Sequence, residues 1–275
     1  MTIWVTGASS GLGMYTAQAL RDAGHTVIAG ARSFEPGEAE GIHRLKLDVT
    51  SDESVAAFVQ AALAVSPRAD ALVQCAGIIA MGPCEELDAD EYRRIMETNF
   101  LGMVRMNRHV LPLMRENGGG KIVLFSSING LLGIPFQSAY VASKHAIEGY
   151  AECLQLEVRR HGIQVCLVEP GDHRGGSENY RQKVIGSRSP YAKDFEHGTA
   201  VIRRDEKNGC DPARLGRKVA AAVQRRRMPF RLRVASADQH LAVWLHKLLP
   251  ARLNEQVLRI YYLPNGKNGM NLPEM

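Results

Sequence analysis

The sequence lacks the features of a secreted, metal-binding or membrane-spanning protein. Its five cysteines are an odd number and form no CxxC pair, which disfavours a disulfide framework and a structural zinc site. Its nine histidines are dispersed, without an HExxH pattern. No run approaches the ~18 apolar residues that a membrane span needs, and the first residues lack the basic region of a signal peptide. We therefore expect a cytoplasmic protein without a metal site.

Composition and charge indicate one globular domain and leave several classes of partner open. The chain has 275 residues, of which 45% are hydrophobic, 6% aromatic and 23% charged, enough for one large α/β domain with a core. A net charge of +5 would suit nucleic acid, an anionic membrane surface or simply an anionic cofactor. Because no helix-turn-helix, zinc-finger or aromatic–basic RNA motif is present, we expect no nucleic-acid partner.

Short apolar runs alternate with longer helical patterns along the first 235 residues. This alternation is typical of right-handed βαβ units and predicts an α/β fold with a single doubly wound parallel sheet of the Rossmann type. We expect strands at Thr2–Val5, Thr26–Ala29, Arg44–Leu47, Ala71–Cys75, Lys121–Ser126, Ile163–Val168 and Phe230–Val234. We expect helices at Met14–Ala23, Asp52–Val65, Asp90–Arg115 with a kink near Phe100–Gly102, Ala139–His161 and Pro212–Arg226.

Two segments have a different character. Residues 172–210 are polar and rich in glycine, and because so long a patternless stretch is usually functional, we expect a loop that covers a substrate. Residues 236–275 predict a C-terminal helical extension, not an independent domain, with two amphipathic helices broken at Pro250. Its apolar stripe follows a run of arginines and is typical of a helix that packs on its own domain or on a subunit partner. Weak peripheral membrane contact through these helices is the alternative.

A glycine-rich segment lies between the first expected strand and the first expected helix. Thr6–Gly13 reads TGASSGLG, and glycine tolerates the positive φ of a tight turn. Backbone amides at the start of the helix carry partial positive charge and suit a pyrophosphate, although an ordinary strand–helix turn has a similar sequence. The cofactor-binding candidates here are Gly7, Ser9, Ser10, Gly11, Leu12 and Gly13.

Tyr140 and Lys144 are four residues apart on an expected helix, so their side chains share one face. A free phenol titrates near ~10 and is a poor base at neutral pH. A cation about 4 Å away, at an effective dielectric constant near 20, would lower the phenol pKa by about three units. We expect Lys144 to tune Tyr140 in this way. An isolated pair of this kind more often lies on a partly exposed helix without function.

The glycine loop is followed, in this order, by Asp48-Val49-Thr50, Asn99, Ser127, Tyr140 and Lys144. With these motifs, the sequence resembles the short-chain dehydrogenase/reductase family. The likeness runs from residue 2 to about residue 171 and is nearest to the hydroxysteroid and retinol dehydrogenase branch. It implies hydride transfer between a nicotinamide and an alcohol or carbonyl group, within a catalytic domain over residues 1–235. By resemblance, Tyr140 exchanges the proton, Ser127 polarises the carbonyl, Lys144 also binds the nicotinamide ribose, and Asn99 bends its helix and holds a relay water.

The end of the second expected strand bears on the choice of cofactor. It reads Ala29-Gly30-Ala31-Arg32, and the acid that usually binds the ribose of NAD is missing. A guanidinium can hold a 2′-phosphate by charge-assisted hydrogen bonds, so we expect NADP(H), with Arg32 and the Ser10 hydroxyl as ligands. Alternatively, Arg32 is a solvated arginine, or a bend in the loop brings Glu35 to the ribose. The resemblance adds Asp48, Val49, Ala76, Gly77, Tyr140, Lys144, Pro170 and Gly171 to the cofactor site.

Two positions depart from the family pattern. Cys75 replaces an asparagine that usually braces the sheet, and Gly175, with Ser177 nearby, stands where a threonine usually contacts the nicotinamide amide. Both departures affect residues that surround the active site, and neither changes a side chain that transfers the proton.

The substrate and the assembly are less well defined by the sequence. Leu131, Leu132, Ile134 and Phe136 favour a bulky hydrophobic small-molecule substrate of steroid, retinoid or polyketide type, although some of them could simply pack in the core. We expect a homodimer or homotetramer. An NADP(H)-binding redox sensor without turnover is the rival reading, and the retained Tyr140 and Lys144 favour the enzyme.

Overall fold

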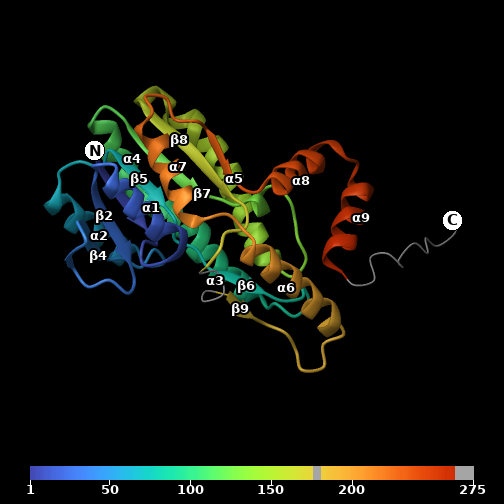
Figure 1. Cartoon of the computed structure of the whole chain (residues 1–275). Helices are drawn as coiled ribbons and strands as arrows, with labels where there is room; N and C mark the ends of the chain where they lie inside the picture. The colour runs from blue at the N-terminus through green and yellow to red at the C-terminus, as the bar shows by residue number, and fades with distance from the viewer. Residues whose placement is uncertain (176–180, 264–275) are drawn as a thin grey trace.

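The computed structural model describes residues 1–175 and 181–263. Its main sheet contains β1 (Thr2–Thr6), β2 (Thr26–Ala31), β3 (Gly37–Ala39), β4 (Ile42–Lys46), β5 (Ala71–Gln74), β7 (Gly120–Phe125), β8 (Ile163–Pro170) and β10 (Arg231–Val234). These eight strands follow the order β10-β8-β7-β5-β1-β2-β4-β3, and every neighbouring pair is parallel except β3–β4 (Figure 1). The predicted doubly wound parallel sheet is confirmed.

Helices cover both faces of this sheet, so its central strands are buried on both sides. On one face lie α1 (Gly11–Asp22) and α7 (Pro212–Gln224), which pack around Ile3 and Val5. On the other lie α2 (Asp52–Val65), α4 (Gly102–Glu116) and α5 (Ser138–Val158), which pack around Trp4. The alternation of these three β1 residues between the two cores follows from the two-residue period of a strand.

The long expected helix before β7 is interrupted where the kink was predicted. It divides into α3 (Ala89–Met96), a π-helical turn at Glu97–Leu101 and α4. Gly102 follows the π turn, and a Cβ there would lie 2.7 Å from the Val49 side chain. Such turns are frequent at functional sites, and this one contains the buried Asn99.

The expectation that residues 172–210 lack regular structure is wrong. The segment contributes β9 (Arg181–Lys183), which pairs with β6 (Ile79–Met81), and the 16-residue helix α6 (Ala192–Lys207). Only a few apolar residues of α6 are buried, among them Phe195 and Ile202, and the charged residues between them obscure the helical period in the sequence. Short turns of 3₁₀-helix at Ile128–Gly130 and Arg159–His161 complete the described secondary structure.

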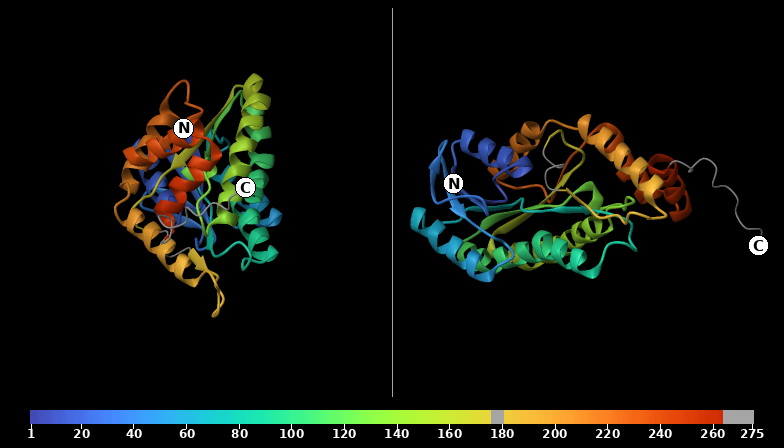
Figure 2. Two further views of the ribbon diagram at one scale, coloured as in Figure 1. Left: turned by 90° about the vertical axis from the view of Figure 1, so that its right-hand side faces the viewer. Right: turned by 90° about the horizontal axis from the view of Figure 1, so that it is seen from below.

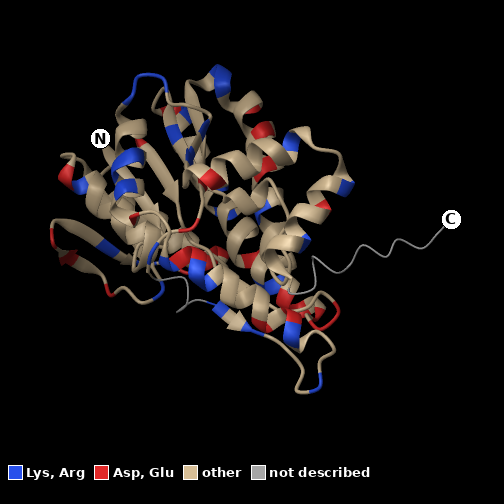
Figure 3. Cartoon of the chain, turned by 45° about the vertical axis from the view of Figure 1, so that its right-hand side comes forward, with Lys and Arg blue, Asp and Glu red and all other residues tan. Residues whose placement is uncertain are grey.

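The C-terminal helices extend away from the sheet. They are α8 (Ala237–Leu248) and α9 (Ala251–Tyr262), joined at Pro250 as expected. Together with α6 they lie at the end of the molecule farthest from the N-terminus, and α9 packs mainly on α6 (Figure 2). α8 and α9 carry charged residues of both signs, namely Asp238, Lys247, Arg252, Glu255 and Arg259 (Figure 3). No helix in the described part of the chain is both long and apolar enough to span a bilayer.

Candidate active site

A cavity of about 970 Å³ opens where the main parallel strands end at their carboxyl termini, the usual position of a ligand in such a sheet. Every cofactor and catalytic residue predicted from the sequence lines it except Asn99. Segments from β1, β2, β5, β7, α5 and β8 thus converge on one site. Among the described residues, no group of three or more His, Cys, Asp or Glu side chains is arranged to hold a metal ion.

The glycine loop has the geometry of a phosphate cradle. Gly7 and Gly11 adopt φ of +67° and +53°, and a Cβ on Gly13 would lie 2.2 Å from the Gly7 carbonyl oxygen. Gly11 has open space where its Cβ would be, and the first turn of α1 carries no acidic residue. Ser10 precedes α1 without capping it. The exposed amides and the absence of a competing carboxylate fit the pyrophosphate of a dinucleotide.

The adenosine end of the cavity carries a cation and an ionised acid. Arg32, exposed just beyond β2, lines the cavity, and Glu35, the residue that could have competed for the ribose, does not. Asp48 accepts hydrogen bonds from the Thr50 amide at 2.9 Å and the Thr50 hydroxyl at 2.8 Å. Burial opposes ionisation of Asp48, but these bonds and the charges of Arg32 and Arg105 outweigh it and lower the Asp48 pKa.

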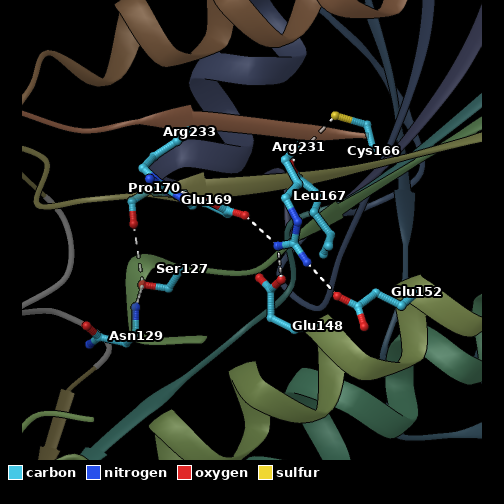
Figure 4. A network of polar contacts seen from close by, with 10 residues as sticks. All are labelled: Ser127, Asn129, Glu148, Glu152, Cys166, Leu167, Glu169, Pro170, Arg231 and Arg233. Carbon is cyan, nitrogen blue, oxygen red and sulfur yellow. Dashed lines mark hydrogen bonds and ion pairs between the residues drawn. The ribbon is translucent and has the colours of Figure 1, made fainter. Parts of the chain in front are cut away.

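Tyr140 and Ser127 form the reactive corner of the cavity. The Ser127 Oγ accepts from the Asn129 amide at 3.1 Å and donates to the Pro170 carbonyl at 3.4 Å, which fixes its position (Figure 4). Burial raises the pKa of Tyr140 to about 12, although a hydrogen bond with the Ser127 side chain opposes the rise. This direction is opposite to the one expected from Lys144 alone, because removal from water outweighs the nearby charges. Tyr140 is therefore a neutral phenol that can donate a proton.

Lys144 lies beside Tyr140, but its ammonium group forms its hydrogen bond with a backbone carbonyl. Its Nζ is 5.4 Å from the centre of the Tyr140 ring and donates to the Phe125 carbonyl at 2.7 Å. Burial lowers the pKa of Lys144 to about 8, so the group can gain and lose a proton near neutral pH. Both side chains come from one face of α5 and reach the same cavity as the glycine loop.

Asn99 lies behind the cavity wall and organises its backbone. Its Oδ1 accepts from the Ile78 amide at 2.8 Å, and its Nδ2 donates to the Ile78 carbonyl and the Ser143 hydroxyl, each at 3.0 Å. Asn99 and Lys144 both flank Gly77, since a Cβ on that glycine would lie 3.4 Å from Asn99 Oδ1 and 3.9 Å from Lys144 Nζ. In this structure, Asn99 acts on the site through neighbouring backbone.

The two departures from the family pattern have a simple structural setting. Cys75 is half-buried and packs beside Gly13, and burial raises the pKa of its thiol, so it acts as a small apolar group. All five cysteines are free. Gly175 lines the cavity with φ of +75°, a conformation that disfavours threonine. Ser177 lies outside the described residues.

Sequence reasoning missed a charged group that lines the cavity close to Tyr140. Asp172 follows Gly171 directly, and Glu206 and Arg181 come from α6 and β9 and form an ion pair. Burial, together with the charges of Glu206 and Asp205, raises the pKa of Asp172 to about 7. Both Asp172 and Glu206 act to raise the Tyr140 pKa, and Arg181 opposes them. The position of Asp172 at the end of a parallel strand was the one available signal.

The apolar wall differs from the expectation. Leu132 and Ile134 line the cavity, whereas Phe136 packs in the core against Phe195 with ring centres 5.3 Å apart. Leu131 is also outside the lining. The far wall comes instead from Ile202 of α6 and from α9, where Val257 and Leu258 face the cavity.

A parallel sheet with a glycine loop at its carboxyl edge and a tyrosine–lysine pair beside it defines an oxidoreductase of the dinucleotide-binding type. The sequence model of the short chain dehydrogenase family matches residues 1–182. The chain belongs to the short-chain dehydrogenase/reductase family, as the sequence resemblance implied, and acts on CH–OH or C=O groups.

Named relatives extend over most of the chain. A 3-ketodihydrosphingosine reductase of Bacteroides thetaiotaomicron is 40% identical over 94% of this chain and 97% of its own length. Human retinol dehydrogenase 8 is 37% identical over 62% of this chain and 58% of its own. The crystal structure of a short-chain dehydrogenase from Streptomyces avermitilis superposes with a TM-score of 0.79 at 32% identity, and the match covers 93% of this chain and 95% of that one.

Proposed function

We propose that the protein is an NADP(H)-dependent reductase of long-chain, bulky hydrophobic ketones. The observation that carries this proposal is the placement of the Tyr140 phenol, half-buried and hydrogen-bonded to Ser127, in the same cavity as the glycine loop and Arg32. A phenol that holds its proton is suited to reduction, in which the carbonyl oxygen must receive one.

NADPH, when bound, supplies the hydride. The amides of the glycine loop would bind its pyrophosphate, Arg32 and Ser10 would bind the 2′-phosphate, and Asp48 would accept from the adenine amine. Ser127 turns its hydroxyl hydrogen from the Pro170 carbonyl, 3.4 Å away, to the substrate carbonyl and stabilises charge that develops on the substrate oxygen. Tyr140 gives its proton to that oxygen, and Lys144, with a pKa near 8, restores the proton from the protein side. The oxidation of an alcohol uses the same groups in reverse.

Arg32→Ala should raise KM for NADPH about tenfold or more and change KM for NADH less than twofold, because a charge-assisted hydrogen bond contributes about 1.5–3 kcal/mol. Steady-state kinetics with both cofactors measures this. Arg115→Ala is the matched control, since Arg115 is exposed near the end of α4, away from the cavity. A wild-type kcat/KM that is higher with NADH than with NADPH would contradict the assignment.

For the substrate, we infer a long-chain ketone that carries an amine next to the carbonyl. The relative from Bacteroides is named for 3-ketodihydrosphingosine, a ketone of this kind. Two features of the cavity are compatible with such a molecule. Leu132, Ile134 and Ile202 offer an apolar wall for an alkyl chain, and Asp172 offers a carboxylate near Tyr140 for an ammonium group.

The amine preference predicts a particular pH dependence. Because the pKa of Asp172 is raised to about 7, its carboxylate forms as the pH rises through that value. The kcat/KM for the amino ketone, divided by that for a ketone of equal length without the amine, should therefore increase between pH 6 and pH 8. Asp172→Asn should lower this ratio about tenfold or more at pH 8 and flatten its pH profile.

Asp205→Asn is the control at pH 8, since Asp205 belongs to the same charged region but bonds to Arg204 and Tyr261. Its loss lowers the Asp172 pKa, so Asp172 stays ionised at that pH and the ratio should be unchanged. An unchanged ratio in Asp172→Asn would rule out recognition of the amine by this carboxylate. A wild-type protein that binds NADPH but turns over no ketone or alcohol in a broad panel would instead favour the redox sensor.

A further inference from the structure

The C-terminal helices carry an exposed apolar face. On α8, the exposed apolar residues are Leu241, Trp244 and Leu248, at spacings of three and four residues. On α9, they are Leu253, Val257, Ile260 and Tyr261, again at helical spacing. Trp244 is 57% exposed and Leu248 is 60% exposed, and α9 buries none of its residues. Of the partners expected from the sequence, packing on the chain's own domain is therefore excluded for these side chains, which leaves a subunit partner or a membrane surface.

This face is continuous with the active-site cavity. Val257 and Tyr261 are both exposed and line the cavity, so the apolar surface of α9 passes from the outside of the molecule into the site. Ala242 on α8 also lines it. A long alkyl chain that enters over α9 would find Val257 and Leu258 at the entrance and Ile202 and Leu132 further along the cavity lining. A route of this kind suits a substrate that passes from a lipid phase into the active site without crossing water.

The charges around the face favour one occupant. Lys247 and Arg252 flank the junction of α8 and α9, and both are exposed and form no ion pair with the described residues. Arg259, further along α9, is exposed too but is paired with Glu255 at 3.9 Å. Apolar side chains with a tryptophan, bordered by cations, are typical of helices that lie in the interface of an anionic bilayer. A face made only for a second copy of the chain would not need to lead into the cavity.

We propose that the exposed face of α8 and α9 docks the protein on an anionic lipid bilayer, so that a membrane-resident ketone enters the cavity over α9. Docking itself rests on the exposed face, whereas the identity of the entering molecule rests on the proposed function. Figure 1 shows the two helices extending away from the sheet, a position from which they can reach a surface without covering the sheet.

The test is flotation of the full chain with vesicles of phosphatidylcholine, with and without phosphatidylglycerol. Wild-type protein should float with the anionic vesicles, and the double variant Trp244→Ser/Leu248→Ser should lose binding at least tenfold. Neither of these residues lines the cavity, so kcat/KM for a short soluble ketone should stay within twofold. Leu156→Ser is the matched control, because Leu156 is 75% exposed on α5, outside this face, and should float like the wild type.

A second measurement separates docking from the proposed function. With a long-chain ketone presented in anionic vesicles, the double variant should turn over at least fivefold more slowly than the wild type. If no ketone is reduced by any form of the protein, the proposed function fails while flotation still decides docking. Docking is overturned if the wild type does not float or if the double variant floats equally well. It is also overturned if light scattering shows that the double variant splits a stable oligomer, because the face would then join copies of the chain.

Discussion

Tyr140→Phe should lower kcat/KM for ketone reduction about a thousandfold and leave the Kd for NADPH within about twofold, since a general acid typically contributes 10²–10⁴-fold. The substitution removes one oxygen and keeps the ring that packs beside Lys144. Without the hydroxyl, the carbonyl oxygen loses its proton donor, and Ser127 remains as the only nearby hydrogen-bond donor proposed for it. Steady-state kinetics and a fluorescence titration with NADPH measure the two quantities.

Tyr150→Phe is a closely matched control for this change. Tyr150 also belongs to α5, but its hydroxyl accepts from Asn107 Nδ2 at 2.9 Å, and Asn107 in turn accepts from Gln74 at 2.8 Å, away from the cavity. Loss of this bond should cost about 1 kcal/mol of stability and leave kcat/KM nearly unchanged. If Tyr140→Phe keeps even a tenth of the wild-type rate, the proton donor must be another group.

The site could be predicted from the sequence where its geometry is local. Tyr140 and Lys144 share a face because they lie one helical turn apart, and the glycine loop joins a strand and a helix that are adjacent in the chain. The order of the sheet then brings these segments together at one edge. The direction of the Tyr140 pKa could not be predicted in this way, because it depends on burial by residues from distant segments.

The residues that were missed depend on contacts between distant parts of the chain. Glu206 and Arg181 are 25 residues apart within a segment whose composition resembles a loop, and only the folded α6 brings them to the cavity near Tyr140. Arg231 and Arg233 belong to the arginine-rich stretch before the C-terminal helices, yet both bind the fully buried Glu169, more than 60 positions earlier. Charge patterns in a sequence do not reveal such partners when no short spacing links them.

That buried carboxylate supports the reactive corner of the site. Glu169 Oε1 accepts from Arg231 at 2.7 Å, and Oε2 accepts from Arg233 at 2.8 Å (Figure 4). Arg231 also bonds to Glu148 and Glu152 on α5, the helix that carries Tyr140 and Lys144. Glu169 directly precedes Pro170, whose carbonyl accepts from Ser127. The network thus ties β8 and β10 to α5 behind the catalytic groups.

Glu169→Gln should destabilise the protein by about 3 kcal/mol, because removal of one partner from a buried ion pair leaves the opposite charges without compensation. For a domain of this size, that change corresponds to a decrease in Tm of about 6–12 °C in a thermal melt followed by circular dichroism. Glu152→Gln is the control, since Glu152 holds the same Arg231 at 2.7 Å but its side chain is 61% exposed. An exposed pair contributes at most about 1 kcal/mol, so this variant should melt within a few degrees of the wild type.

Equal melting temperatures for the two variants would show that the buried carboxylate of Glu169 contributes no more to the stability of the protein than the exposed carboxylate of Glu152. If Glu169→Gln alone loses stability, while its kcat/KM at 25 °C falls only severalfold, then Glu169 acts by holding Ser127 and α5 in their positions relative to each other.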